Sequence, residues 1–212
     1  MAEDGARRPS RQDSAPRRRL LAWAAGLAAA TLAPAGTAAA SGFDLDRLMA
    51  LLATRSGGEA RFTEERTVAS LDTPLRSSGR LSFAAPDRFS RHTEEPSPES
   101  MEVQGNSVVL RRGTRTRRMN LDTVPELAAL ADALRGTLSG NAALLQRHFS
   151  VAVRGNAGRW VLALTPREAQ LARSLLGIEV AGSGPDVRSI EMSMAGGDRS
   201  LMLVEPLRPS RP

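Results

Sequence analysis

Between residues 79 and 95 the chain alternates apolar and polar side chains, and no other feature constrains its fold as strongly. Leu81, Phe83 and Phe89 share one parity along this stretch, whereas their arginine and serine neighbours share the other. Successive side chains of a β-strand point to opposite faces of its sheet. The alternation therefore predicts two strands, separated near Pro86, that present one apolar face and one polar face.

Strand and turn patterns of this kind continue through most of the chain. Turn residues such as Gly, Pro and Asn separate eleven short segments that are typical of strands. Gly105-Asn106 has the composition of a two-residue hairpin turn between two of them. The predicted strands cover residues 60–69, 77–85, 88–95, 100–104, 107–112, 115–120, 150–154, 159–165, 178–182, 187–194 and 200–205.

Helices are predicted at both ends of the first run of strands and again further along the chain. Asp44 can cap a first helix, which carries a leucine-rich stripe. The second follows a capping box at residues 123–126, ends at Gly136 and precedes a short helix from about Asn141. Another capping-box pattern at residues 165–168 predicts a further helix. Together these patterns predict a mainly β, α+β fold, with a strongly curved antiparallel sheet of about eleven strands wrapping the helices.

The N-terminal residues 1–40 have the organisation of a secretory signal peptide. Six arginines precede an apolar run, and Thr37–Ala40 follows as a cleavage site. The mature chain is expected to begin at Ser41 and to form a single domain over residues 41–212. The arginine run at residues 17–19 suits the twin-arginine route as well as the Sec route. We therefore expect a periplasmic or secreted protein with a cleaved leader.

Composition narrows the function classes. The chain contains no cysteine, which excludes disulfides, thiolate metal sites and the lipid-modified cysteine of a lipoprotein. All 29 basic residues are arginine, and removal of the leader leaves 23 arginines against 20 acidic residues, a net charge of +3. A charge this small, without interleaved aromatic residues, is not the pattern of a nucleic-acid-binding protein.

No arrangement of residues in the sequence indicates a catalytic site. His92 and His148 are the only histidines, so a transition-metal site would need both together with carboxylates. The acidic pairs at 64–65 and 94–95 point to opposite faces of a strand, and no serine lies in a G-x-S-x-G turn. We therefore expect a protein that is not an enzyme and holds no metal or cofactor. A hydrolase whose catalytic residues are dispersed along the chain is a further alternative.

Several short motifs, taken in their order along the chain, resemble those of one family. They are Ala60-x-Phe62-Thr63-Glu64, Gly79-x-Leu81-x-Phe83, Pro86-x-x-Phe89, Pro96, the Gly105 hairpin, the helical insert and Leu164-Thr165-Pro166. Across residues 43–205 the chain resembles the LolA-like family of periplasmic carriers of outer-membrane lipoproteins. The resemblance implies an incomplete antiparallel β-barrel whose helical lid covers an apolar cavity for acyl chains.

The resemblance also implies a site and partners. The cavity and lid would be formed by Phe62, Leu81, Phe83, Phe89, Met101, Leu127, Leu130 and Leu134. A carrier of this kind would be a monomer that takes lipoprotein or other acylated lipid cargo from an inner-membrane donor protein to an outer-membrane acceptor protein. Family members usually have Arg before the proline at position 86, where it helps to hold the lid closed. Ala85 takes that place here, which predicts a divergent member whose lid is held by apolar contacts alone.

Two features allow more than one interpretation. The leucine stripe of the second helix suits either an ordinary buried face or a lid over removable acyl chains. The arginine-rich stretch 111–118 suits a solvated hairpin, or a positive rim for acidic head groups or an acidic partner. The arginines of that rim would be Arg115, Arg117 and Arg118. The sequence accordingly favours a lipid or lipoprotein carrier, with a non-catalytic accessory module of envelope lipid or polymer assembly as the alternative.

Overall fold

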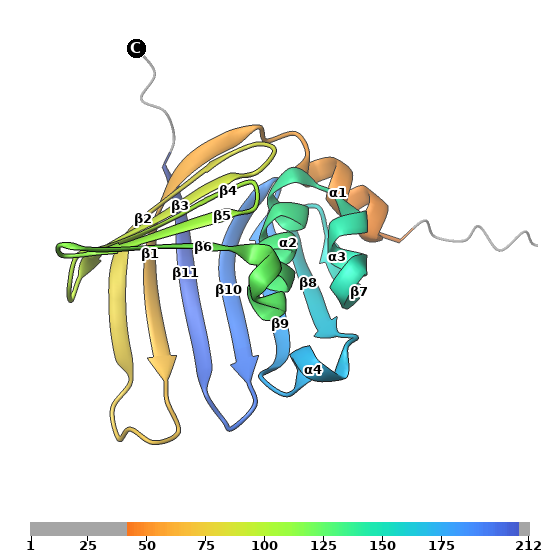
Figure 1. Ribbon diagram of the computed structural model, residues 1–212. Helices are drawn as coiled ribbons and strands as arrows, with labels where there is room; N and C mark the ends of the chain where they lie inside the picture. The colour runs from red at the N-terminus through yellow and green to blue at the C-terminus, as the bar shows by residue number, and fades with distance from the viewer. Residues whose placement is uncertain (1–41, 208–212) are drawn as a thin grey trace, which may run out of the picture. The chain divides into compact units, whose positions relative to one another are not determined.

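One antiparallel sheet of eleven strands dominates the structure, a computed structural model that describes residues 42–207. The predicted signal peptide and its cleavage site before Ser41 lie outside the described residues. Neighbouring strands follow the order β6-β5-β4-β3-β2-β1-β11-β10-β9-β8-β7 (Figure 1). The strands are β1 (Gly57–Thr67), β2 (Leu75–Ala84), β3 (Arg88–Glu95), β4 (Glu99–Gln104), β5 (Ser107–Arg112), β6 (Arg115–Asn120), β7 (Phe149–Asn156), β8 (Arg159–Pro166), β9 (Leu175–Ser183), β10 (Asp186–Met194) and β11 (Arg199–Leu207).

The helices lie before the first half of the sheet, between the two halves, and within the second half. α1 (Leu45–Leu52) precedes β1, and α4 (Ala169–Ala172) lies between β8 and β9. The 3-10 turn η1 (Leu121–Thr123), α2 (Pro125–Ser139) and α3 (Ala142–His148) connect β6 to β7. Asp44 caps α1 as predicted, because its carboxylate accepts a hydrogen bond from the Arg47 amide at 2.9 Å.

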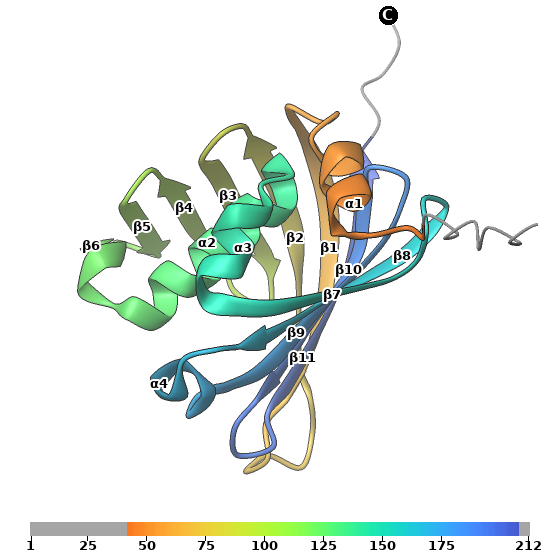
Figure 2. The ribbon, with the colours of Figure 1, turned by 90° about the vertical axis from the view of Figure 1, so that its right-hand side faces the viewer.

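The order of the strands explains why the sheet forms an open half-barrel. The chain builds β1 to β6 outward from the centre, crosses through α2 and α3 to the opposite edge, and returns from β7 to β11. β11 then pairs with β1, whereas β6 and β7 are the two unpaired edges. The sheet is strongly curved, and α2 and α3 lie in front of its concave face (Figures 1 and 2). The predicted incomplete barrel of eleven antiparallel strands is confirmed.

Two glycines of the α2 region have different roles, and only the second ends the helix. The predicted end at Gly136 is wrong, because α2 continues to Ser139 and Gly140 closes it with a left-handed φ of 66°. A Cβ on Gly136 would lie 2.7 Å from Leu145 Cδ2, so the missing side chain lets α3 pack closely against α2. The glycine at 136 thus serves packing between helices, and the one at 140 serves helix termination.

The helix predicted after residue 165 is also largely wrong. Thr165 and Pro166 are the end of β8, paired with Ser150 and Phe149, and the chain is strand again from Leu175. Only the four residues of α4 are helical. The Glu168 side chain makes no capping hydrogen bond, because its carboxylate faces His148 instead.

Three apolar clusters hold the described residues together. The largest packs α1, α2 and α3 against β7, β8 and β9, with Leu145, Trp160 and Leu162 fully buried. The second lies on β1, β2 and β11 around Phe62, and the third joins β4 and β5 to the start of α2. Burial of large apolar side chains stabilises the fold by roughly 1.5–3 kcal/mol each. None of the helices within residues 42–207 combines the length and apolar character needed to cross a membrane.

Candidate functional site

A cavity of about 310 Å³ lies between the concave face of the sheet and α2. Side chains of β1 to β4 line one side of it, side chains of β8 to β11 line the other, and α2 supplies the remaining wall. Most of these side chains are apolar. The lining therefore draws on both halves of the sheet and on the helical connection between them.

Strand alternation places the apolar side chains of the first half on the concave face. Leu81 of β2 pairs with Ala60 of β1 on one side and with Arg91 of β3 on the other. Phe83 pairs with Phe89 in the same way, and all five residues line the cavity. The arrangement follows directly from the period of two in the sequence.

The small and the large side chains of α2 differ in how deeply they are buried. Ala129, Ala133 and Gly136 are buried toward the core of α1 and α3, where small residues allow close approach of the helices. Leu130 and Leu134 are only half-buried, and both line the cavity. Leu130 also packs against the largest apolar cluster, so α2 contributes to the core and to the cavity wall together.

Six of the eight residues predicted for the cavity and lid line this cavity. They are Leu81, Phe83, Phe89, Met101, Leu130 and Leu134. The two others do not. Phe62 is buried below the Arg91 guanidinium, which lies 4.4 Å from the centre of its ring, and Leu127 packs in the third cluster beside Leu121.

The second half of the sheet supplies lining residues to which the sequence analysis gave no role. Ile190 and Met192 lie two residues apart on β10, and Met202 and Val204 lie two residues apart on β11. The same alternation that revealed the first strands is present here. The motifs that carry the family resemblance lie mostly in the first half of the sheet, and so the resemblance implied no cavity residues on β10 or β11.

A charged pair interrupts the apolar lining beside Phe62. Arg91 Nη2 lies 2.5 Å from Glu64 Oε2, and the two side chains are 24% and 12% exposed. Ser200 and Ser77 also donate hydrogen bonds to the Glu64 carboxylate, at 2.5 and 3.2 Å. Burial by itself would raise the pKa of Glu64, but the Ser200 hydrogen bond and the charge of Arg91 outweigh it and hold the pKa below its ordinary value.

A second ion pair lies elsewhere in the lining, between the loop after α1 and the start of β10. Arg55 pairs with Asp186, and both residues line the cavity. Arg188 Nη2 also lies 3.4 Å from the Asp186 carboxylate. Each arginine of the lining therefore has a carboxylate partner.

α2, the predicted lid, is tied to the sheet by a polar contact, so the prediction of apolar contacts alone is wrong. Arg135 of α2 donates a hydrogen bond to the Gly105 carbonyl in the turn between β4 and β5. Its Nη1 also lies 3.6 Å from the buried carboxylate of Asp132, which accepts a 2.7 Å hydrogen bond from Arg147. A guanidinium on α2 thus contacts the turn between β4 and β5, whereas position 85, in the turn between β2 and β3, carries only a methyl group.

The three arginines predicted for a positive rim lie on the edge strand β6, and all three are exposed. They do not share one face. Arg117 pairs with Leu110 and Arg115 with Arg112, which puts both on the concave side, whereas Arg118 pairs with Val109 on the outer side.

The two histidines lie on different elements, β3 and α3, and do not form a joint site. His92 is exposed on β3, opposite Arg80. His148 ends α3 and lies between the carboxylates of Glu168, at 3.1 Å, and Asp132, at 3.4 Å. Over residues 42–207 no group of three or more His, Asp or Glu side chains is arranged to hold a metal ion.

Solved structures similar to this chain come from several bacteria. A LolA superfamily protein from Nitrosomonas europaea is 9% identical, with a TM-score of 0.43, over 79% of this chain and 93% of that chain. A putative outer membrane lipoprotein-sorting protein domain from Vibrio parahaemolyticus is 7% identical, with a TM-score of 0.42, over 79% and 92%. The MucA/MucB complex of Pseudomonas aeruginosa contains a chain 17% identical, with a TM-score of 0.35, over 79% and 59%.

Comparison with family models gives the assignment. A search among curated proteins found no match. The model described as "Outer membrane lipoprotein carrier protein LolA-like" matches residues 35–205, which is most of the 212-residue chain and includes β1 to β10 and most of β11. The chain therefore belongs to the LolA-like family of outer membrane lipoprotein carrier proteins.

Proposed function

We propose that the protein is a non-enzymatic periplasmic carrier that holds acyl chains of lipids or lipoproteins in the cavity under α2. The observation that supports this most strongly is the cavity itself, which is lined by an apolar sheet face and by a helix whose leucines are half-buried. Ligand pockets in proteins are mostly apolar with a few polar groups, and their volumes begin at about 300 Å³. A cavity of about 310 Å³ is at the small end of that range. Outward movement of α2 would enlarge it for a longer chain.

Membership of the family and the predicted leader favour the remaining parts of the proposal. The carrier would receive its cargo from an inner-membrane donor protein, release it to an outer-membrane acceptor protein, and act as a monomer. An accessory module of envelope assembly would have the same fold but would not bind acyl chains. Binding of an apolar ligand therefore separates the two functions.

The test introduces a charge into the cavity wall. Leu134→Glu should weaken binding of an apolar fluorescent probe by more than tenfold, because burying a leucine is worth roughly 1.5–3 kcal/mol and 1.4 kcal/mol is already tenfold. Leu127→Glu is the matched control, since Leu127 is half-buried on the same helix but does not line the cavity. Probe affinity and thermal stability are measured for both variants and for the unchanged protein.

Each outcome has a separate meaning. A folded Leu134→Glu variant with lost probe binding, beside a Leu127→Glu variant that still binds, supports the carrier. Unfolding of Leu134→Glu would make Leu134 an ordinary core residue. A folded Leu134→Glu variant with unchanged affinity would place the ligand elsewhere. Failure of the unchanged protein to bind the probe would favour the accessory module.

A further inference from the structure

The arginines that line the cavity are already neutralised by carboxylates. Arg91 is paired with Glu64, and Arg55 is paired with Asp186. Neither pair leaves a positive charge free for a ligand. An anionic group that accompanies an acyl chain into this cavity therefore has to find its counter-charge outside the lining.

Strand pairing extends the concave face from the cavity to the edge strand. Met101 lines the cavity and pairs with Leu110, which in turn pairs with Arg117. Since neighbouring strands lie about 4.8 Å apart, the Cα of Arg117 lies roughly 10 Å from that of Met101. Arg117 therefore continues a row of side chains that begins in the cavity wall.

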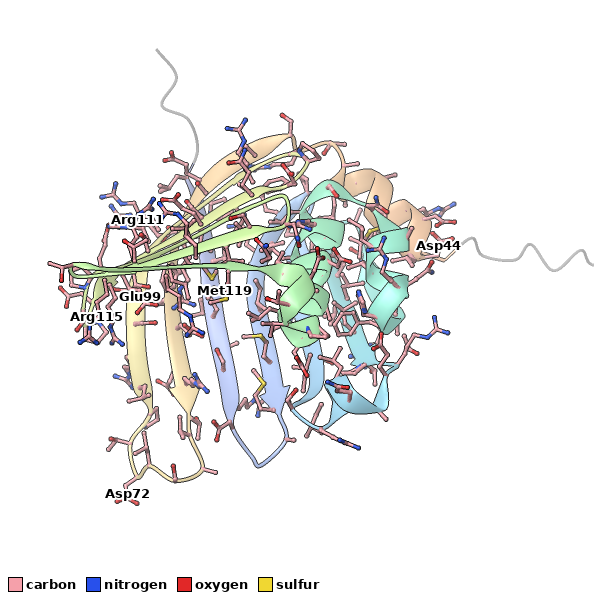
Figure 3. All side chains as sticks on the ribbon, viewed as in Figure 1. Asp44, Asp72, Glu99, Arg111, Arg115 and Met119 are labelled. Atoms are coloured by element: carbon pink, nitrogen blue, oxygen red, sulfur yellow. The ribbon has the colours of Figure 1, made fainter. Side chains whose placement is uncertain are left out.

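Arg115 lies on the same face, two residues further from the cavity. It pairs with Arg112, and Arg112 pairs with Glu99. Figure 3 shows Glu99 and Arg115 on one side of the β5 and β6 ribbons and Arg111 on the other. Met119 points to the same side as Arg115, toward the interior of the half-barrel (Figure 3).

Positive charge is in excess on this part of the concave face. Glu99 Oε2 lies 3.5 Å from Arg112 Nε and so offsets one guanidinium. Within residues 42–207, neither Arg115 nor Arg117 forms an ion pair, and both are exposed. Two guanidiniums without a carboxylate partner thus lie two residues apart on β6, on the face of the sheet that carries the cavity.

From this arrangement we infer that the ligand is an anionic amphiphile, and that Arg115 and Arg117 bind its phosphate or carboxylate head group while its acyl chain fills the cavity. The inference rests on the proposed carrier function and adds the chemical class of the cargo. Guanidinium groups are well suited to phosphate and carboxylate because they offer paired N–H donors. The face on which the two arginines lie favours a cavity ligand over an acidic protein. A protein docking on the β6 edge would meet Arg118 on the outer face as readily.

The test compares two lipids that differ only in the head group. Lysophosphatidylglycerol is anionic and lysophosphatidylcholine is zwitterionic, and each displaces a neutral apolar fluorophore at low ionic strength. Exposed ion pairs each contribute modestly, and two of them together should give the unchanged protein roughly a twofold to thirtyfold preference for the anionic lipid. Arg115→Gln/Arg117→Gln should abolish that preference and leave the affinity for the fluorophore unchanged.

A charge-matched control separates a head-group site from net charge. Arg61→Gln/Arg118→Gln removes the same two charges from the outer face, where Arg61 precedes the inward-facing Phe62 and Arg118 pairs with Val109. This variant should keep the preference. Inorganic phosphate should reduce the preference only as much as chloride of equal ionic strength, because the head group is tethered by its acyl chain. A larger effect of phosphate would identify a free-anion site and overturn the inference.

Failure of this inference can be told apart from failure of the carrier function. If both lipids displace the fluorophore equally well from the unchanged protein, the head-group site is excluded and the carrier stands. Equal loss of preference in both double variants would also exclude the head-group site, since the change in net charge alone would then explain the effect. If neither lipid displaces the fluorophore, the carrier function itself is contradicted.

Discussion

Glu64 shows how one carboxylate can stay ionised beside an apolar cavity. It accepts hydrogen bonds from Arg91, Ser200 and Ser77, so all of its partners donate to the charged form. Arg91 in turn covers the ring of Phe62 and takes part in the cavity lining. Removing the charge of Glu64 would therefore leave a guanidinium without its partner in the cavity wall.

We predict that Glu64→Gln lowers the free energy of unfolding by about 2–3 kcal/mol at pH 7, because hydrogen bonds to a charged group are worth about 1.5–3 kcal/mol. The pKa of Glu64 is below its ordinary value in the folded chain. Its contribution to stability is therefore complete above the unfolded pKa of about 4.3 and is lost as pH falls through the folded pKa. Denaturant unfolding at several pH values should show that the free energy of unfolding falls less steeply toward acidic pH in the variant than in the unchanged protein.

The neighbouring residue provides the control for this measurement. Glu65 pairs with Arg76 at 3.0 Å on the exposed face, where the two side chains are 48% and 80% exposed. Glu65→Gln should change the free energy of unfolding by less than about 1 kcal/mol at pH 7. Equal effects of the two substitutions would show that the environment of Glu64 has no special role.

The sequence could predict on which face of the sheet a side chain lies, but not whether that side chain lines the cavity or is buried beneath another. Leu81, Phe83 and Phe89 face the cavity because a period of two places them there whatever the neighbouring strands are. Phe62 has the right parity as well, yet it lies under Arg91 and outside the lining. Only the register between β1 and its neighbours decides that difference, and no local pattern encodes it.

α2 combines the roles of core helix and cavity wall, which the sequence analysis treated as alternatives. Ala129, Ala133 and Gly136 are buried in the core that α2 shares with the other helices, while Leu130 and Leu134 line the cavity. The helix remains attached to the sheet through Arg135, whose Nη2 donates to the Gly105 carbonyl. No spacing rule could predict that contact, because the two residues are 30 positions apart and belong to different elements.

The contact of Arg135 predicts a measurable effect on ligand exchange. Arg135→Met keeps much of the apolar stem but removes the donor to the sheet, which should weaken lid closure by about 1–1.5 kcal/mol. We expect dissociation of a cavity-bound fluorophore, measured by stopped flow, to become about tenfold faster. Hydrogen exchange in the hairpin of β4 and β5 should also increase.

Arg147→Met is the control for the Arg135 variant. Arg147 donates to the same carboxylate of Asp132 at 2.7 Å, but its guanidinium has no contact with the hairpin of β4 and β5 among those the structure describes. Dissociation from this variant should stay close to that of the unchanged protein. Similar acceleration in both would assign the effect to Asp132, and no acceleration in Arg135→Met would contradict a holding role for its guanidinium.

The pairing of β1 with β11 makes the two halves of the sheet one body. Glu59 pairs with Leu207 and Thr67 with Arg199, so the contact joins segments more than 130 residues apart. Hairpins such as the one at Gly105-Asn106, with Gln104 opposite Ser107, could be predicted from local turn chemistry. The long-range pairing could be anticipated only through the family resemblance, because no turn residue specifies it. The cavity wall on β9 to β11 depends on that pairing and was missed for the same reason.

A ligand that contacts both halves of the sheet and α2 should stabilise the whole molecule as one unit. At a free apolar ligand concentration of 100 times Kd, linkage predicts about 2.7 kcal/mol of added stability. That corresponds to a rise in Tm of roughly 5–11 °C for a domain of this size. Calorimetry should show a single transition that moves as a whole, with a Tm independent of protein concentration if the carrier is a monomer. The Leu134→Glu variant should show little rise. Two transitions, of which the ligand moves only one, would mean that the ligand binds one half of the sheet and not the cavity between them.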